Sequence, residues 1–176
     1  MDPRAADDVV KRVVRRRADT LAEAQFAIAQ FSGWVTNADT KAGLLATATT
    51  ILGGALVGQR TAIRASFTPD SWREWALAAV LVWTLAAVVT TAVALTAALR
   101  PRVVARGHSR FSWPTVAATP VHELLAADRR TAAREAWRAA HDLAVIARMK
   151  FRWLRLALLA WANGATGLFV WFLLSP

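Results

Sequence analysis

The residue types that could do chemistry gather in a short polar cluster, Asn37, Asp39 and Lys41, which lies directly before an uncharged stretch over 42–59. A carboxylate and an ammonium group at the edge of an apolar segment need a reason, because an unpaired charge is costly there. Two interpretations are open. One is an ion pair that anchors a helix, formed by Asp39 with Lys41 or with an arginine. The other is a polar binding site beneath a bilayer.

Signals for catalysis or metal binding are weak elsewhere in the chain. The three histidines are not spaced as metal ligands, and the chain has no cysteine. The Gly53-Gly54 pair lies inside an apolar stretch, so it does not resemble a phosphate-binding loop. No nucleophile with a neighbouring base and no pair of carboxylates stands out. The sequence therefore predicts a protein that is not an enzyme and uses no metal or cofactor.

Composition favours a membrane protein over an ordinary soluble domain. Apolar residues make up 56% of the 176 residues and charged residues 19%, against about 45–50% and about 25% in a typical globular domain. The uncharged stretches 42–59, 75–99 and 156–174 are long enough to cross a bilayer, which takes about 17–25 residues. We expect an all-α integral membrane protein with three transmembrane helices over these ranges, in contact with lipid.

The distribution of basic residues predicts the orientation. Segment 1–41 holds seven Lys and Arg residues, loop 60–74 holds three, and segment 100–155 holds twelve. Cytoplasmic segments carry the excess of positive charge, so the N-terminus and 100–155 are expected inside. Tryptophans fit this orientation, with Trp72, Trp75 and Trp171 at the outer face, whereas Trp83 falls mid-span and is expected to pack.

The two cytoplasmic segments are expected to be helical. Segment 1–41 carries a coiled-coil-like apolar seam from Val10 to Val35 that only Arg17 breaks, and this amphipathic helix packs either on its own chain or on a second copy. Segment 100–155 begins as a Pro- and Gly-punctuated loop and then enters a helix, expected to run unbroken over 121–171.

Small and polar residues predict how the spans pack. The first span places a small residue at every fourth position: Ala42, Ala46, Thr50, Gly54 and Gly58. Such ladders let helix backbones approach closely, either within one chain or between copies of a homo-oligomer. Asn163, the amide of the third span, either bonds a neighbouring helix or lines a pore. The Thr68-Pro69 pair predicts the start of the second helix.

A basic patch near the N-terminus has three interpretations: a nucleic acid, anionic lipid headgroups, or one small phosphate. It consists of Lys11, Arg12, Arg15, Arg16 and Arg17. The apolar stretches favour the headgroups, since a membrane attracts neighbouring polybasic segments. We therefore expect no nucleic acid polymer as a partner.

The run from Asn37 to Leu45, NADTKAGLL, resembles the A-D-x-K-A-x-L-L motif of the Pycsar transmembrane effectors. Pro101-Arg102 and the run KFRWL over 150–154 resemble other recurring features, and the similarity covers roughly 21–174. The resemblance implies bacterial defence against phage. A cognate pyrimidine cyclase makes a cyclic pyrimidine mononucleotide (cCMP or cUMP), an inner-membrane effector responds, membrane integrity fails, and infection is abortive. No cyclic-nucleotide-binding β-barrel is recognisable, so sensing is assigned to the helical cytoplasmic parts.

A cyclic mononucleotide needs one or two basic groups for its phosphate and an aromatic face or polar groups for its base. Trp34 and Trp113 are the expected stacking partners. The predicted nucleotide-binding residues are Trp34, the polar cluster, and the basic residues near the inner ends of the second and third spans. They are Trp34, Asn37, Asp39, Lys41, Arg100, Arg102, Lys150 and Arg152. Two other functions stay open, a non-signalling membrane anchor or assembly subunit and a nucleotide-independent pore former.

Overall fold

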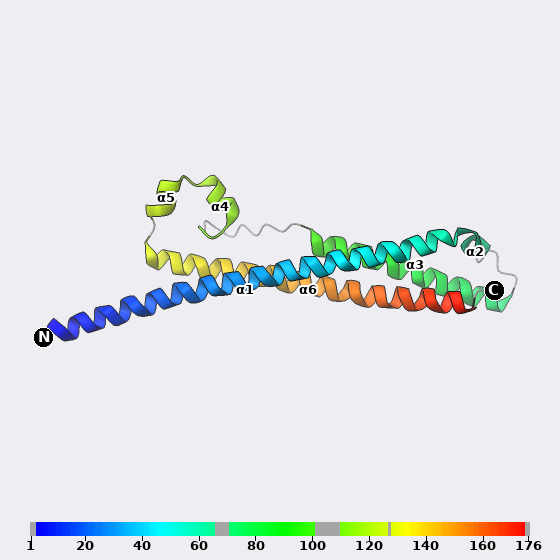
Figure 1. Ribbon diagram of the computed structural model, residues 1–176, viewed down its shortest axis with the longest axis horizontal. Coiled ribbons are helices and arrows are strands. Elements are labelled where there is room, and N and C mark those ends of the chain that lie inside the picture. The colour runs from blue at the N-terminus through cyan, green and yellow to red at the C-terminus, as the bar shows by residue number, and fades with distance from the viewer. Residues whose placement is uncertain (1–2, 66–70, 101–109, 127, 175–176) are drawn as a thin grey trace. The chain divides into compact units, whose positions relative to one another are not determined.

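The computed structural model describes the backbone of residues 3–65, 71–100, 110–126 and 128–174, and within these ranges all regular structure is helical (Figure 1). The elements are α1 (Pro3–Gly58), α2 (Arg60–Ala65), α3 (Trp72–Leu99), α4 (Trp113–Ala118), α5 (Val121–Ala126) and α6 (Arg129–Leu174). No strand occurs in the described ranges. The prediction of an all-α fold is confirmed.

The chain divides into two compact units. Unit 1 contains Met1–Thr36 and Pro101–Arg148, and unit 2 contains Asn37–Arg100 and Met149–Pro176. Helices α1 and α6 each begin in unit 1 and end in unit 2. Helix α1 starts at Pro3, because proline is tolerated in the first turn. No further proline interrupts the helix, so its 56 residues reach about 84 Å at about 1.5 Å per residue.

The helix expected to be unbroken over 121–171 is two helices. Helix α5 ends at Ala126, and α6 begins at Arg129. The backbone N–H of Ala132 donates to the carbonyl of Asp128 at 3.1 Å, so Asp128 stands at the start of α6. Aspartate favours this flanking position over a helix interior, which accounts for the break.

Unit 2 is a bundle of three helices with two apolar clusters. In the first cluster α1 contributes Ala42 and Leu45, α3 contributes Ala94 and Leu95, and α6 contributes Leu154 and Ala157. In the second, Leu56, Leu81, Leu168 and Trp171 are buried together. All three helices supply residues to both clusters, so each helix packs on the other two.

A close helix contact in unit 2 joins α3 to α6. A Cβ at Gly167 would collide with the hydroxyl of Thr84, and one at Gly164 would lie 3.4 Å from the Cβ of Ala87. Thr84 and Thr91 are fully buried, and each hydroxyl donates at 2.8 Å to a carbonyl one turn earlier in α3. Their polar groups are therefore satisfied within one helix, while α6 lies close enough that only glycine fits at 167.

The start of α3 differs from its prediction. Ser71 is the N-cap, and its hydroxyl oxygen accepts from the backbone N–H of Glu74 at 3.4 Å. The expected cap, Thr68-Pro69, lies outside the described residues. Serine is among the strongest N-cap residues, and Glu74 in the first turn adds the favoured negative charge.

Unit 1 contains the first part of α1, the short helices α4 and α5, and the first part of α6. Along α1 the predicted seam is its least exposed face: Ala24 is fully buried, and Leu21, Ile28 and Phe31 are half-buried. The seam residues before 20 have no described side chains. Four alanines of α6 are buried: Ala132, Ala136, Ala140 and Ala147.

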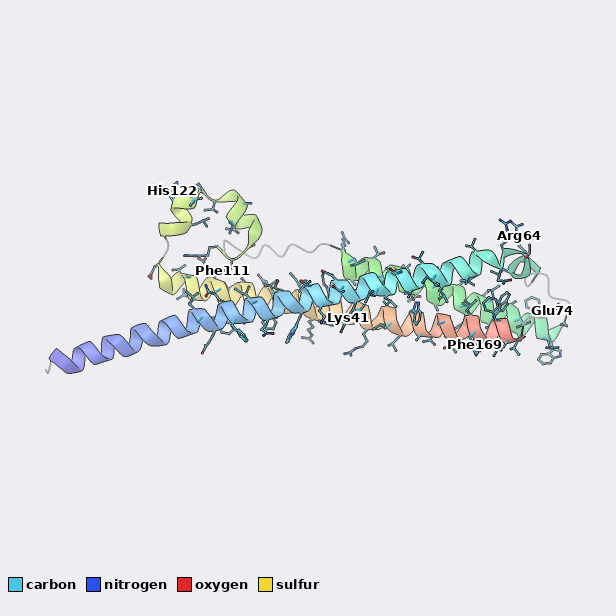
Figure 2. The ribbon with its side chains drawn as sticks, viewed as in Figure 1. Lys41, Arg64, Glu74, Phe111, His122 and Phe169 are labelled. Carbon is cyan, nitrogen blue, oxygen red and sulfur yellow. The ribbon has the colours of Figure 1, made fainter. Side chains whose placement is uncertain are left out.

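A salt bridge ties the segment before α4 to α6 within unit 1. The Nε of Arg110 and its backbone N–H each donate to Oε2 of Glu135 at 3.2 Å. Both side chains are largely buried, with 20% and 16% of their surface exposed. Figure 2 labels the neighbouring Phe111, and also His122, which lies on α5. Arg110 is thus engaged with a carboxylate.

The apolar surface of unit 2 is suited to lipid. Three helices of the described chain are long and apolar enough to cross a membrane. In each of them, only 17–28% of the most apolar 18-residue stretch is buried inside the protein. Large side chains such as Ile51, Val57 and Phe169 are 63–70% exposed, and Figure 2 labels Phe169 on α6. Water would make so much exposed apolar surface unfavourable, whereas a bilayer covers it.

The burial of two tryptophans does not follow from their positions along the spans. Trp171, expected at the outer face, is 1% exposed inside the second cluster, with its ring edge against Phe172. Trp83, expected to pack, is 63% exposed. Position along a span predicts the depth of a residue in the membrane. Burial against the other helices depends instead on the face of the helix, because each of the three packed helices has a buried and an exposed face.

Candidate functional site

The nine residues from Asn37 to Leu45 form about two and a half turns of α1. Ala38, Ala42 and Leu45 are buried, and their spacing of four and three residues places them on one face of the helix. Asn37 and Lys41 are exposed, and Figure 2 labels Lys41 on α1. The small alanines let α1 approach its neighbours closely, which brings the adjacent Asp39 within reach of α6.

Asp39 forms an ion pair with Lys150 of α6. The Nζ of Lys150 donates to Oδ1 of Asp39, across 111 positions of sequence. The Lys150 side chain is 12% exposed and that of Asp39 is 42% exposed. The prediction that Asp39 pairs with Lys41 or an arginine is wrong, because its carboxylate pairs with Lys150. Lys41 is exposed on another side of α1. The pair fixes α1 to α6 where both helices enter unit 2.

Among the described residues of unit 2, neither Arg100 nor Arg152 forms a hydrogen bond or salt bridge with this pair. Arg100 is exposed at the end of α3, where its backbone N–H donates to the carbonyl of Thr96 at 3.0 Å. Arg152 is exposed on α6. Trp34 belongs to unit 1, is 51% exposed, and meets Phe31 edge-on at 5.3 Å between ring centroids. Arg102 and the side chain of Trp113 lie outside the described residues.

The small-residue ladder of the first span divides in two. Ala42 is in the first apolar cluster and Ala46 packs against it. Thr50, Gly54 and Gly58 are exposed, and a Cβ at either glycine would meet nothing within 4 Å. The first half of the ladder therefore packs within the chain, and the second half is an exposed helix face made of small residues.

Asn163 is exposed, and its amide donates to the carbonyl of Leu159 in the same helix at 2.8 Å. It lines a cavity of about 510 Å³ between α3 and α6, together with Trp83, Thr166 and Gly167. Neither of the two expected roles, a bond to a neighbouring helix or the wall of a pore, is visible in the described chain.

One cluster of charged, polar and aromatic residues was not predicted from the sequence. Arg134, Trp137, Arg138, His141 and Asp142 line a cavity along α6 in unit 1. Their recurrence every three or four residues was the available signal, since that spacing puts them on one helix face. Among the described residues, no three His, Asp or Glu side chains are placed to hold a metal ion.

Three helices that are long and apolar enough to cross a membrane define an integral membrane protein of the helical class. A comparison with protein families is more specific. The chain matches the model of the Pycsar effector protein domain over residues 23–175. The protein therefore belongs to the Pycsar effector family, and the resemblance found in the sequence is confirmed. No curated protein and no solved structure matches the chain.

Proposed function

We propose that this protein is the membrane effector of an antiphage system and that a cyclic pyrimidine mononucleotide, cCMP or cUMP, activates it. A cognate pyrimidine cyclase would supply the nucleotide after infection. The effector then impairs the inner membrane, and the cell dies before phage mature. The observation that carries the proposal is the family match over residues 23–175.

The proposed orientation has the N-terminus and segment 100–155 in the cytoplasm. Its support is the charge distribution, since this arrangement places 19 of the 22 Lys and Arg residues inside. Unit 1 then contains most of the charged residues that face the cytoplasm, where the nucleotide is made. The basic patch before residue 20 would lie near anionic headgroups.

The proposed response passes through α1 and α6. Both helices run from unit 1 into unit 2, and the Asp39–Lys150 pair joins them at the start of unit 2. A ligand shifts an equilibrium only if it binds one arrangement better than the other. Nucleotide binding in unit 1 that favours a new packing of these helices would strain the pair and rearrange the spans.

The proposed active state is a homo-oligomer. Its support is the exposed second half of the first-span ladder, Thr50, Gly54 and Gly58, where another helix backbone could approach closely. Burying this face between copies would give the exposed glycines a packing partner that the described part of the chain does not provide.

The proposal is tested in bacteria that express the protein together with an inducible pyrimidine cyclase or its inactive variant. We expect growth arrest and loss of membrane potential only with the active cyclase. Equal toxicity without nucleotide would instead identify a constitutive pore former. Absence of toxicity under both conditions, with the protein inserted normally, would identify a membrane anchor.

A further inference from the structure

A cavity of about 450 Å³ lies along α6 in unit 1, apart from the Asp39–Lys150 pair. Its described lining consists of five side chains: Arg134, Trp137, Arg138, His141 and Asp142. The volume falls within the range of about 300–1,000 Å³ that is usual for small-molecule sites. The lining is basic and aromatic, which contrasts with the buried alanines on the other side of the same helix.

Both guanidinium groups of this cavity are available to a ligand. Arg134 and Arg138 are exposed, and in the part of the chain that the structure describes neither is paired with a carboxylate. Arg110 of the same unit differs, because Glu135 already occupies it. Two guanidinium groups and the single carboxylate of Asp142 leave one net positive charge when His141 is neutral. A ligand with one negative charge complements this cavity.

Trp137 adds a surface for a flat ring. Its side chain is 44% exposed, whereas its neighbours Ala136 and Ala140 are buried. An exposed indole beside two arginines is the combination that single nucleotides use, because the base stacks on the ring while the phosphate accepts hydrogen bonds from the guanidinium groups. His141 and Asp142 offer further hydrogen-bonding groups for the sugar or the edge of the base.

We propose that this cavity is the nucleotide site, with the cyclic phosphate on Arg134 and Arg138 and the pyrimidine stacked on Trp137. The inference rests on the proposed function for the identity of the ligand, while the cavity supplies the chemistry. A cyclic phosphodiester carries one negative charge and a pyrimidine is one flat ring, so both match the lining. The site lies on the helix that carries Lys150, eight residues beyond Asp142, which connects binding to the ion pair.

The test measures binding of cCMP and cUMP to the full chain, purified in a neutral detergent, by titration calorimetry at one salt concentration. The variants are Trp137→Ala and the double change Arg134→Ala with Arg138→Ala. We expect each to weaken binding at least about tenfold, because a stacking contact or a charge-assisted hydrogen bond contributes that much. Trp137→Phe keeps a ring and should recover most of the affinity.

The matched control is a second exposed Trp–Arg pair, Trp72 and Arg73 at the start of α3 in unit 2. Changing both to alanine should leave the affinity unchanged. All the altered side chains are exposed or half-exposed, so circular dichroism should report the same helical content in every variant.

The outcomes separate the site from the proposed function. If the parent chain binds nucleotide and the α6 variants bind equally well, the inferred site is wrong and the proposed function stands. If the parent chain binds neither nucleotide, both are wrong. Weakening by the arginine changes without any effect of Trp137→Ala would overturn the inference in favour of a phosphate site without a stacked base. Tighter binding of a single-stranded pyrimidine oligonucleotide would overturn it in favour of a polymer.

Discussion

Removing the carboxylate of Asp39 should destabilise the protein through the lysine that it leaves behind. Losing one partner of a fully buried ion pair costs about 3–5 kcal/mol, whereas an exposed pair contributes about 0–1 kcal/mol. Lys150 is 12% exposed and Asp39 is 42% exposed, so the pair lies between these limits. We expect Asp39→Ala to lower the free energy of unfolding by about 1–3 kcal/mol.

The double change Asp39→Ala with Lys150→Met isolates the interaction. Methionine keeps an apolar stem and removes the ammonium group, so no unpaired charge remains near the bundle. The two single changes should therefore sum to a loss about 1–2 kcal/mol greater than that of the double variant, a coupling typical of residues in contact. Thermal unfolding in detergent micelles measures all four proteins.

Lys41→Ala is the control for this cycle. Lys41 stands two residues from Asp39 but is exposed, so its removal should change stability by less than about 0.5 kcal/mol. Additive effects of the two changes at 39 and 150, to within about 0.5 kcal/mol, would refute the ion pair as the contact that fixes α1 to α6. A loss of stability in Lys41→Ala as large as in Asp39→Ala would refute it as well.

Three further expectations follow from the helix contacts and the charge distribution. Gly167→Ala should destabilise the protein by about 1–3 kcal/mol through overpacking, because the added Cβ meets the Thr84 hydroxyl. Adding Thr84→Ala should relieve much of that loss in thermal unfolding, and no relief would contradict this contact. Gly54→Leu should leave stability within about 0.5 kcal/mol, because a Cβ at Gly54 would meet no atom of the described residues within 4 Å. The change should nevertheless reduce crosslinking between copies and toxicity, and unchanged crosslinking would reject the proposed interface. A reporter at the C-terminus should read as external and one inserted at Gly107 as cytoplasmic, and the same side for both would refute three spans.

The helices were predictable from the sequence because uncharged length and proline positions determine them. Residues 42–59, 75–99 and 156–174 all lie within long helices apart from Gln59, which forms the turn after α1. The break before Arg129 was not predicted, because it depends on Asp128 at a helix start and no glycine or proline signals it.

The site was predictable only in part, because spacing along one helix does not identify a partner on another. The sequence placed Asp39 and Lys150 in the same group, since each stands just before an apolar span, but it offered Lys41 as the nearer partner. The buried faces of α1 and α6 decide the pairing. Likewise the sequence did not single out Gly167 as a close contact within the chain, because the face of α6 that meets α3 is set by how three helices pack.

The most direct test of ligand-controlled membrane damage uses purified protein reconstituted in lipid vesicles that hold a potassium diffusion potential. A voltage-sensitive dye reports the potential before and after addition of cCMP or cUMP, with the linear 5′-monophosphate as the control ligand. We expect the potential to be stable with protein alone and with the linear nucleotide, and to collapse within the same preparation when a cyclic pyrimidine nucleotide is added. Collapse at the same rate without nucleotide, or no collapse with any nucleotide at saturating concentration, would contradict this expectation.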